Sequence, residues 1–240
     1  MELLSSPFIA AAHVLIGFGK SDKPTRQADY SVARHQRWVG ALIDALDLRD
    51  ITLFGQDWGS SIGLRLAAEK DARFGRIVIG NGLLPGEEGF QTKRALIRAW
   101  RAFTRWSPWI PVGQIVSRAS GRTLSAEERR AYDAPFPSNA YLAGVRVFPR
   151  LIPMSAEDPA TAGNVATWEV LKRWTKPFLT VYSNGDPVLG DWDALFQERV
   201  PGAAGQAHTR VEGGHFLQEA AGPELARHIH ELIITETGGV

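Results

Sequence analysis

The chain has 240 residues, of which 44% are hydrophobic and 22% charged, and its formal net charge is +1. Such a composition is typical of a globular protein with one sizeable core, and the balanced charge gives no reason to expect a nucleic acid, a membrane surface or an acidic partner. Cysteine is absent, which excludes disulfides, thiolate metal sites and a cysteine nucleophile.

The start of the chain lacks the basic segment of a signal peptide, and Ser5, Ser6 and Pro7 interrupt any apolar run there. No apolar stretch approaches the roughly 20 residues that a membrane-spanning helix needs. We therefore expect a cytoplasmic protein, either a monomer or a weak homo-oligomer.

Short β-rich runs alternate with longer helical patterns from Asp50 to Val211, as is typical of a parallel sheet covered by helices. Strands are expected over 51–54, 76–79, 178–182 and near 208–211. Helices are expected after the N-cap Ser31, through 64–68, over 166–174, near 192–199 and from 223 towards 234. The apolar face of the first helix is expected to consist of Trp38, Leu42, Ile43 and Leu46.

The pattern changes between 85 and 159, where the chain is helical, rich in Arg, Trp and Pro, and without a convincing strand. A helical block inserted between the strands of such a sheet predicts a cap over a substrate pocket. We therefore expect a core of 1–84 and 160–240 and a cap of 85–159. A solvated helix face is expected for Arg94, Arg98, Arg101 and Arg105.

A nucleophile motif follows the first expected strand. Gly-Gln-Asp-Trp-Gly at 55–59 leads directly into a helix, which is the nucleophile-elbow pattern with aspartate in place of serine. Gly55 and Gly59 are expected to let the turn pack tightly, and the helix N-terminus favours a carboxylate at Asp57. A role limited to capping the helix is the alternative for Asp57.

Two further residues follow expected strands in the order that the α/β-hydrolase fold uses, nucleophile, acid and histidine. Asp186 comes directly after the strand at 178–182, and His215 lies on a glycine-rich loop after the strand near 208–211. The carboxyl ends of parallel strands share one edge of a sheet. We therefore expect Asp57, Asp186 and His215 to form a catalytic triad.

An aspartate nucleophile suits substitution at a saturated carbon. A carboxylate is already charged at neutral pH, and its attack on an alkyl halide or epoxide gives an alkyl ester on the enzyme. His215 would then activate water to cleave that ester, while Asp186 orients the imidazole and stabilises its cation.

With these motifs the sequence resembles a haloalkane dehalogenase from Leu15 onwards. The resemblance rests on Gly-Phe-Gly-Lys-Ser-Asp-Lys-Pro at 17–24, Gln-Asp-Trp-Gly at 56–59, Ala-Pro-Phe-Pro at 134–137 and Gly-His-Phe-Leu-Gln-Glu at 214–219. It implies an α/β-hydrolase fold, with a mostly parallel sheet, helices on both faces and an inserted helical cap. The implied substrate is a small apolar halogenated molecule that is hydrolysed without a cofactor.

The resemblance also implies a halide site made by two tryptophans. Trp58 would donate its indole N–H to the departing halide ion and its backbone N–H to the oxyanion. The second tryptophan should come from the cap, with Trp100 preferred, then Trp106, then Trp109.

The sequence departs from the family at its beginning. Three further strands and a His-Gly oxyanion loop are expected ahead of Leu15, yet none of the six histidines precedes a glycine, and only 8–14 is left for the strand that should precede Leu15. An N-terminally shortened sheet, with an uncovered strand edge, is therefore expected.

Two alternatives remain. An epoxide hydrolase shares the same triad but needs acidic phenols in the cap, for which Tyr132 and Tyr141 are the candidates. A non-catalytic fragment of a hydrolase is the other. No metal is expected, because His228 and His230 stand two apart on an expected helix and point in different directions.

Overall fold

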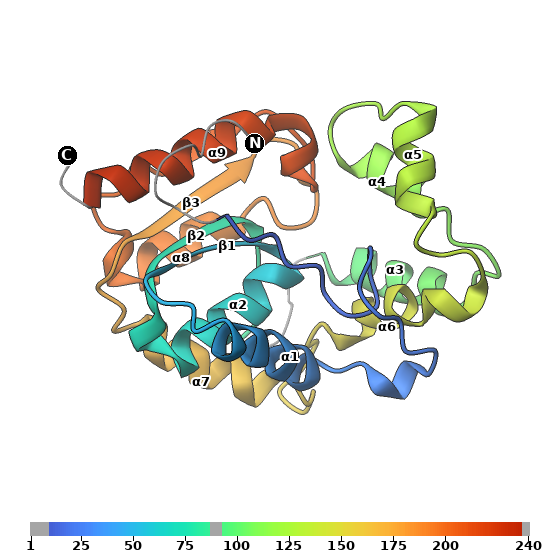
Figure 1. Cartoon of the computed structure of the whole chain (residues 1–240), viewed down its shortest axis with the longest axis horizontal. Helices are drawn as coiled ribbons and strands as arrows, with labels where there is room; N and C mark the ends of the chain where they lie inside the picture. The colour runs from blue at the N-terminus through green and yellow to red at the C-terminus, as the bar shows by residue number, and fades with distance from the viewer. Residues whose placement is uncertain (1–9, 87–92, 237–240) are drawn as a thin grey trace.

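The computed structural model describes residues 10–86 and 93–236, and its centre is a sheet of four parallel strands (Figure 1). The strands are β1 (Ile51–Asp57), β2 (Phe74–Gly82), β3 (Phe178–Ser183) and β4 (Thr209–Val211), paired in that order. The four expected strands are confirmed, and β2 extends beyond the expected run at both ends. Within the described residues β1 pairs with β2 alone, so its other edge carries no strand.

Helices cover both faces of this sheet (Figure 1). They are α1 (Val32–Ala45), α2 (Trp58–Glu69), α7 (Thr161–Leu171), α8 (Trp192–Arg199) and α9 (Leu217–Glu236). Alternate side chains of a strand point to opposite faces, so Ile77 and Phe178 pack against α2, α7 and α8, whereas Val78 and Leu179 pack against α9.

The first helix begins as expected, because the Ser31 side chain accepts a hydrogen bond from the N–H of Arg34. Its apolar face was only partly predicted. Ile43 is buried, but Leu46 lies beyond the helix end and is 58% exposed. The buried face also includes His35 near the start of the helix, which is 1% exposed.

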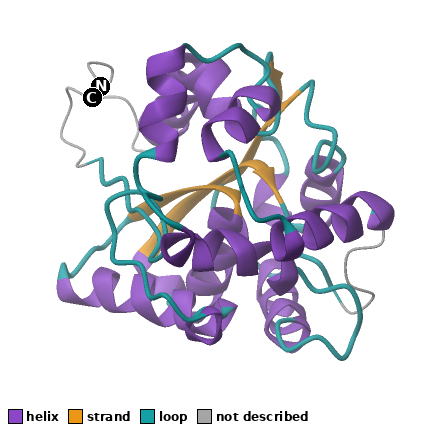
Figure 2. Ribbon diagram, turned by 90° about the vertical axis from the view of Figure 1, so that its right-hand side faces the viewer, coloured by secondary structure: helices purple, strands orange, loops and turns teal. Residues whose placement is uncertain are grey.

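Between β2 and α7 the described residues form four helices, which we call the inserted helices: α3 (Arg94–Trp106), α4 (Val112–Ala119), α5 (Ala126–Asp133) and α6 (Ala143–Leu151). They sit beside the core at the right of Figure 1 and face the viewer in Figure 2. Short 3-10 turns occur at Gln27–Asp29, Asp71–Arg73, Asn139–Leu142 and Pro201–Ala203. No described helix is both long and apolar enough to cross a bilayer.

The expected solvated arginine face of α3 is wrong for two of its four members. Arg101 is half-buried and donates to three carbonyl oxygens at the C-terminal end of α6, and Arg94 donates to the carbonyl oxygen of Met154 at 2.9 Å. The Arg101 guanidinium thus satisfies carbonyls that the end of α6 leaves unpaired, and Arg94 bonds the chain just after that helix. Arg98 and Arg105 are exposed.

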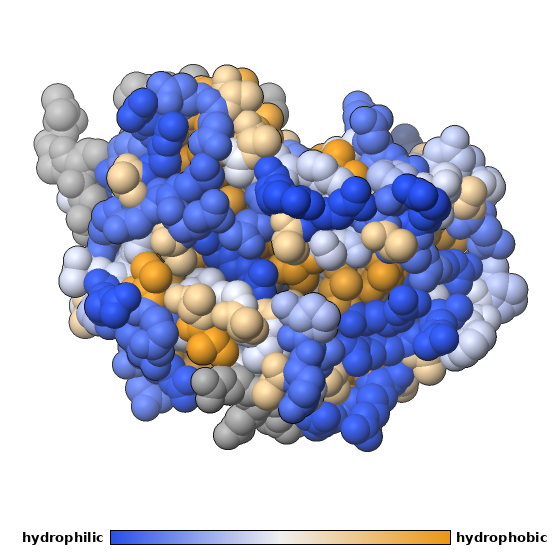
Figure 3. Space-filling view, turned by 90° about the horizontal axis from the view of Figure 1, so that it is seen from below, coloured by the Kyte–Doolittle hydropathy of each residue, from blue (hydrophilic) through white to orange (hydrophobic). Residues whose placement is uncertain are grey.

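The described N-terminal residues agree with the expected N-terminally shortened sheet. Residues 1–9 lie outside the described part of the chain, and Ala10 to Val14 form no strand. Most of the surface seen in Figure 3 is hydrophilic, with apolar side chains visible between hydrophilic bands.

The packing of α2 against the sheet predicts a stability difference. Leu64 is fully buried in the core cluster, so Leu64→Ala should lower the free energy of unfolding by about 2–5 kcal/mol. Leu46→Ala removes an equal side chain from an exposed position and should change it by less than about 0.5 kcal/mol. Urea unfolding of both variants measures this, and equal losses would contradict the burial of Leu64.

Candidate active site

Asp57 lies at the sharp turn between β1 and α2. Its backbone has φ 46° and ψ −119°, a conformation that costs a non-glycine residue on the order of 1–3 kcal/mol and is held by the surrounding structure. A Cβ at Gly55 would lie 2.8 Å from the Cα of Ser60, so only glycine allows this approach. Tight packing does not explain the expected glycine at Gly59, because a Cβ there would meet nothing within 4 Å.

The Asp57 carboxylate is not used to cap α2, since its side chain makes no capping hydrogen bond. Ser60 stabilises the turn instead. Its hydroxyl donates to the backbone oxygen of Asp57 at 2.6 Å and accepts from the N–H of Leu83 at 2.8 Å. The carboxylate, whose side chain is 31% exposed, therefore remains available.

His215 and Asp186 meet Asp57 from two other strand ends. The Nδ1 atom of His215 is 3.0 Å from Oδ2 of Asp186, and its Nε2 atom is 3.9 Å from Oδ2 of Asp57. Asp186 has no exposed side-chain surface, and its Oδ1 accepts the N–H groups of Val188 at 2.8 Å and Leu189 at 3.2 Å. The three predicted triad residues thus lie together, with His215 between Asp57 and Asp186.

The charges around His215 decide its protonation. Burial alone would lower the pKa of the imidazole, but the hydrogen bond to Asp186 and the negative charges of Asp186 and Asp57 raise this pKa to about 10. Burial works in the opposite direction on Asp186, yet the bond and charge of His215 and the two backbone N–H groups bring its pKa below the usual value. Two carboxylates therefore share one imidazolium.

The triad opens into a cavity of about 770 Å³ between the strand ends and the inserted helices. Asp57 and His215 are part of its wall, and almost all the rest of the lining is apolar, for example Phe148, Leu189 and Ile152. A cavity of this kind favours small apolar ligands that carry little hydrogen-bonding capacity.

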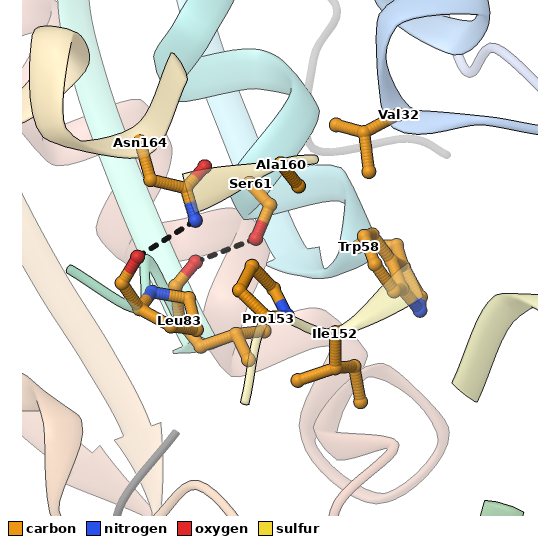
Figure 4. Close-up of a pocket in the computed structure, with 9 residues that line it drawn as sticks. Val32, Trp58, Ser61, Leu83, Ile152, Pro153, Ala160 and Asn164 are labelled. Atoms are coloured by element: carbon orange, nitrogen blue, oxygen red, sulfur yellow. Dashed lines mark hydrogen bonds between the residues drawn. The ribbon is translucent and has the colours of Figure 1, made fainter. Parts of the chain in front are cut away.

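A second cavity, of about 10 Å³, lies beside Trp58 (Figure 4). Its polar side chains are already bonded: Ser61 donates to the oxygen of Leu83 at 2.8 Å, and Asn164 donates to the oxygen of Pro85 at 2.8 Å. The space holds one water at most, so it is a packing gap beside the tryptophan.

The three cap tryptophans differ sharply in position. Trp100 lines the large cavity, as Trp58 does. Trp106 and Trp109 are 73% and 66% exposed, and neither is part of the cavity wall. This arrangement leaves Trp100 as the candidate for the second halide donor.

The two cap phenols are poorly suited to acid catalysis. Tyr132 lines the cavity, but its hydroxyl donates to the Glu219 carboxylate. Burial and this carboxylate raise the pKa of Tyr132 well above its usual value. Tyr141 is 42% exposed and lies outside the cavity wall.

Sequence reasoning missed the residues that hold the His215 loop. Asn81 is fully buried at φ 41°, and its Nδ2 donates to the oxygens of Gly214 at 2.8 Å and His215 at 3.0 Å. Gln56 donates to the same His215 oxygen at 3.0 Å. The only available signal was the Asn81-Gly82 pair at a strand end, because asparagine before glycine tolerates positive φ.

Comparison with known proteins agrees with this geometry. Residues 15–220 match the α/β hydrolase fold family. A haloalkane dehalogenase of Mycolicibacterium paratuberculosis is 52% identical over 215 residues, which are 90% of this chain and 71% of that protein. Haloalkane dehalogenase 1 of Mycobacterium tuberculosis is 49% identical over 228 residues, covering 93% of this chain and 75% of its own length.

A solved structure leads to the same family. The tetrameric haloalkane dehalogenase DpaA from Paraglaciecola agarilytica NO2 superposes with a TM-score of 0.81 at 31% identity, covering 89% of this chain and 70% of that one. The chain belongs to the haloalkane dehalogenase family within the α/β hydrolases.

The raised pKa of His215 predicts a pH-dependent stability. The folded value of about 10 lies above the usual 6.5, so the imidazolium stabilises the fold fully below pH 6.5, and this contribution is lost as the pH rises to about 10. Between these limits the free energy of unfolding should fall more in the wild type than in His215→Gln. Urea unfolding of both proteins at pH 6.5 and at about pH 10 measures this difference. An equal fall in the two proteins would contradict the pairing of His215 with the two carboxylates.

Proposed function

We propose that this enzyme hydrolyses haloalkanes to an alcohol, a halide ion and a proton through an alkyl ester on Asp57. The observation that carries the proposal is a carboxylate held at a strained elbow, facing an apolar cavity, with the Nε2 of His215 only 3.9 Å away. Membership of the haloalkane dehalogenase family supports the reaction, and the geometry supports this route.

In the first step an Asp57 oxygen attacks the carbon that bears the halogen. A carbon–oxygen bond forms while the carbon–halogen bond breaks, and the halide leaves with the bonding electrons. The apolar wall raises the nucleophilicity of the carboxylate by limiting its contact with water. No base is required, because the nucleophile is already an anion.

In the second step water attacks the carbonyl carbon of the Asp57 ester. His215 accepts the proton of this water, the alcohol leaves, and the Asp57 carboxylate is restored. Formation of the ester removes the negative charge of Asp57, which is one of the causes that raise the pKa of His215. The imidazolium therefore releases its proton to solvent more readily once the ester has formed, which is the proton of the overall reaction. The neutral imidazole is then the base for the attacking water, and Asp186 stabilises the cation that forms.

The halide is proposed to leave between the indole N–H groups of Trp58 and Trp100, because both residues line the cavity. An indole N–H is a neutral donor on an apolar ring, so such a site binds an anion without supplying a competing nucleophile. The inserted helices would act as the cap of 85–159 that closes the cavity over a small apolar substrate. Water is the only co-reactant in this balance, so no cofactor is required.

Epoxide hydrolysis is not favoured by any observation of the site. It requires a phenol that donates a proton to the opening oxygen, and the Tyr132 hydroxyl is already committed to Glu219. Its raised pKa makes it a weaker acid than a free phenol.

The covalent route makes opposite predictions for two triad variants. His215→Gln should still release one halide ion per active site from 1-bromobutane and then accumulate the butyl ester, which intact-mass spectrometry detects. Asp57→Asn should release no halide and form no adduct, because the amide is a poor nucleophile. An adduct on Asp57→Asn, or none on His215→Gln with halide turnover retained, would contradict the role of Asp57.

The halide site predicts a difference between two tryptophans of α3. Trp100→Phe removes an N–H from the cavity and should weaken bromide binding roughly tenfold or more, the expected loss of one hydrogen bond to a charged group. Trp106→Phe is the matched control at an exposed position and should leave binding unchanged. Quenching of the remaining indole fluorescence by bromide gives both affinities, and equal affinities would assign the second donor elsewhere.

A further inference from the structure

The loop that carries His215 is bound to the inserted helices on both sides of the histidine. The N–H of Gly214 donates to the backbone oxygen of Ser120 at 2.9 Å, and the N–H of Phe216 donates to the oxygen of Ala119 at 3.3 Å. Both acceptors lie at the C-terminal end of α4, where helix carbonyls lack partners within the helix. The hydrogen bonds therefore join an end of the inserted block directly to the catalytic loop.

This contact leaves no room for side chains. Gly121 has φ +81°, and a Cβ there would lie 2.4 Å from the nitrogen of Gly214. A Cβ at Gly214 would in turn lie 2.3 Å from the oxygen of Ala119. The two backbones are in contact, so a shift of α4 moves the neighbours of His215.

A cluster of polar side chains locks the same two segments together, four residues after the histidine. Glu219 accepts the hydroxyl proton of Tyr132 from α5, and its other carboxylate oxygen lies 2.7 Å from Nη2 of Arg122. Arg122 also donates from Nε to the backbone oxygen of Glu219 at 2.5 Å and from Nη2 to Glu128 at 2.8 Å. The Glu219 side chain is 19% exposed and the Arg122 side chain 36%, so the link is shielded from water mainly at its Glu219 end.

This link is expected to affect hydrolysis of the Asp57 ester more than the attack on the substrate carbon. Asp57 is fixed by β1, the elbow and Ser60, and the Gln56 side chain donates from this segment to the oxygen of His215. Attack on the substrate carbon therefore uses the inserted helices for the cavity wall and for the Trp100 N–H proposed above, but it needs no aimed imidazole. Hydrolysis of the ester does need the imidazole aimed at a water, and a displacement of about 1 Å in such a group costs roughly a hundredfold in rate.

We propose that Glu219, with Arg122 and Tyr132, is a positioning residue for His215: the link clamps the inserted helices onto the catalytic loop and sets the rate of ester hydrolysis. The inference rests on the proposed covalent route, which it deepens by giving the inserted helices a part in the second step.

The kinetic test uses Glu219→Ala and Arg122→Ala, because neither residue lines the cavity. Rapid-mixing measurement of halide release from 1-bromobutane should show a first turnover within about twofold of the wild type. The steady-state rate should fall roughly tenfold or more while alkyl-enzyme accumulates. The double variant should be little slower than either single one, since both remove the same link.

Two further variants separate positioning from a general loss of stability. Arg227→Ala breaks the exposed pair with Glu231 on the same helix α9 and should leave both phases unchanged. Glu219→Gln keeps an oxygen that accepts the Tyr132 hydroxyl and should recover part of the steady-state rate. Equal slowing of the first turnover and the steady state, or a purely additive double variant, would overturn the proposal.

Amide exchange gives a readout that needs no turnover. Hydrogen–deuterium exchange of 213–216 should be faster in Glu219→Ala than in the wild type and in Arg227→Ala, because the Gly214 and Phe216 N–H groups lose their support. Unchanged exchange would overturn the clamp. A wild-type chain that releases no halide would contradict the proposed function instead, and the exchange comparison would still decide whether the link holds the loop.

Discussion

All four strands of the sheet run in the same direction, and the chemistry of this protein depends on that constraint. Asp57 ends β1, Asn81 stands near the end of β2, Asp186 follows β3 and His215 follows β4. Parallel pairing brings these strand ends to one edge of the sheet, although the first and last of them are separated by more than half of the chain. The 3.0 Å bond between His215 and Asp186 is possible only because β3 and β4 are neighbours.

The site places two carboxylates and one imidazole against an apolar wall, which is unfavourable unless the charges compensate one another. Asp186 is satisfied by two backbone N–H groups and by His215. Asp57 makes no capping bond to its own helix, so its charge is compensated mainly by the imidazolium. That compensation changes during the reaction we propose, because the ester of Asp57 is neutral. The same pairing that stabilises the resting site therefore makes the base available after alkylation.

The inserted helices contribute both to the cavity and to the position of the His215 loop. They supply Trp100 and much of the apolar cavity wall, and the end of α4 binds the loop on both sides of His215. Their own attachment depends on partly buried arginines, since Arg101 bonds carbonyls at the end of α6 and Arg122 bonds Glu219. A block rich in arginine is thus held by specific polar contacts as well as by packing.

The sequence alone determined the four strands, the elbow at Asp57 and the order of the triad, because strand periodicity, the Gly55 turn and the strand-end loops are properties of a few neighbouring residues. The choice among Trp100, Trp106 and Trp109, the burial of Arg101 and the exposure of Leu46 were decided by tertiary structure. They depend on which elements meet in the fold and on where a helix ends, and amphipathic spacing fixes neither. The four arginines of α3 share one face, yet Arg94 and Arg101 bond neighbouring carbonyls while Arg98 and Arg105 are exposed. The contacts of Asn81 and Glu219 with the His215 loop and the inserted helices were likewise decided by tertiary structure. Their partners lie 134 and 97 residues away along the chain, and only the packed fold brings them within hydrogen-bonding distance.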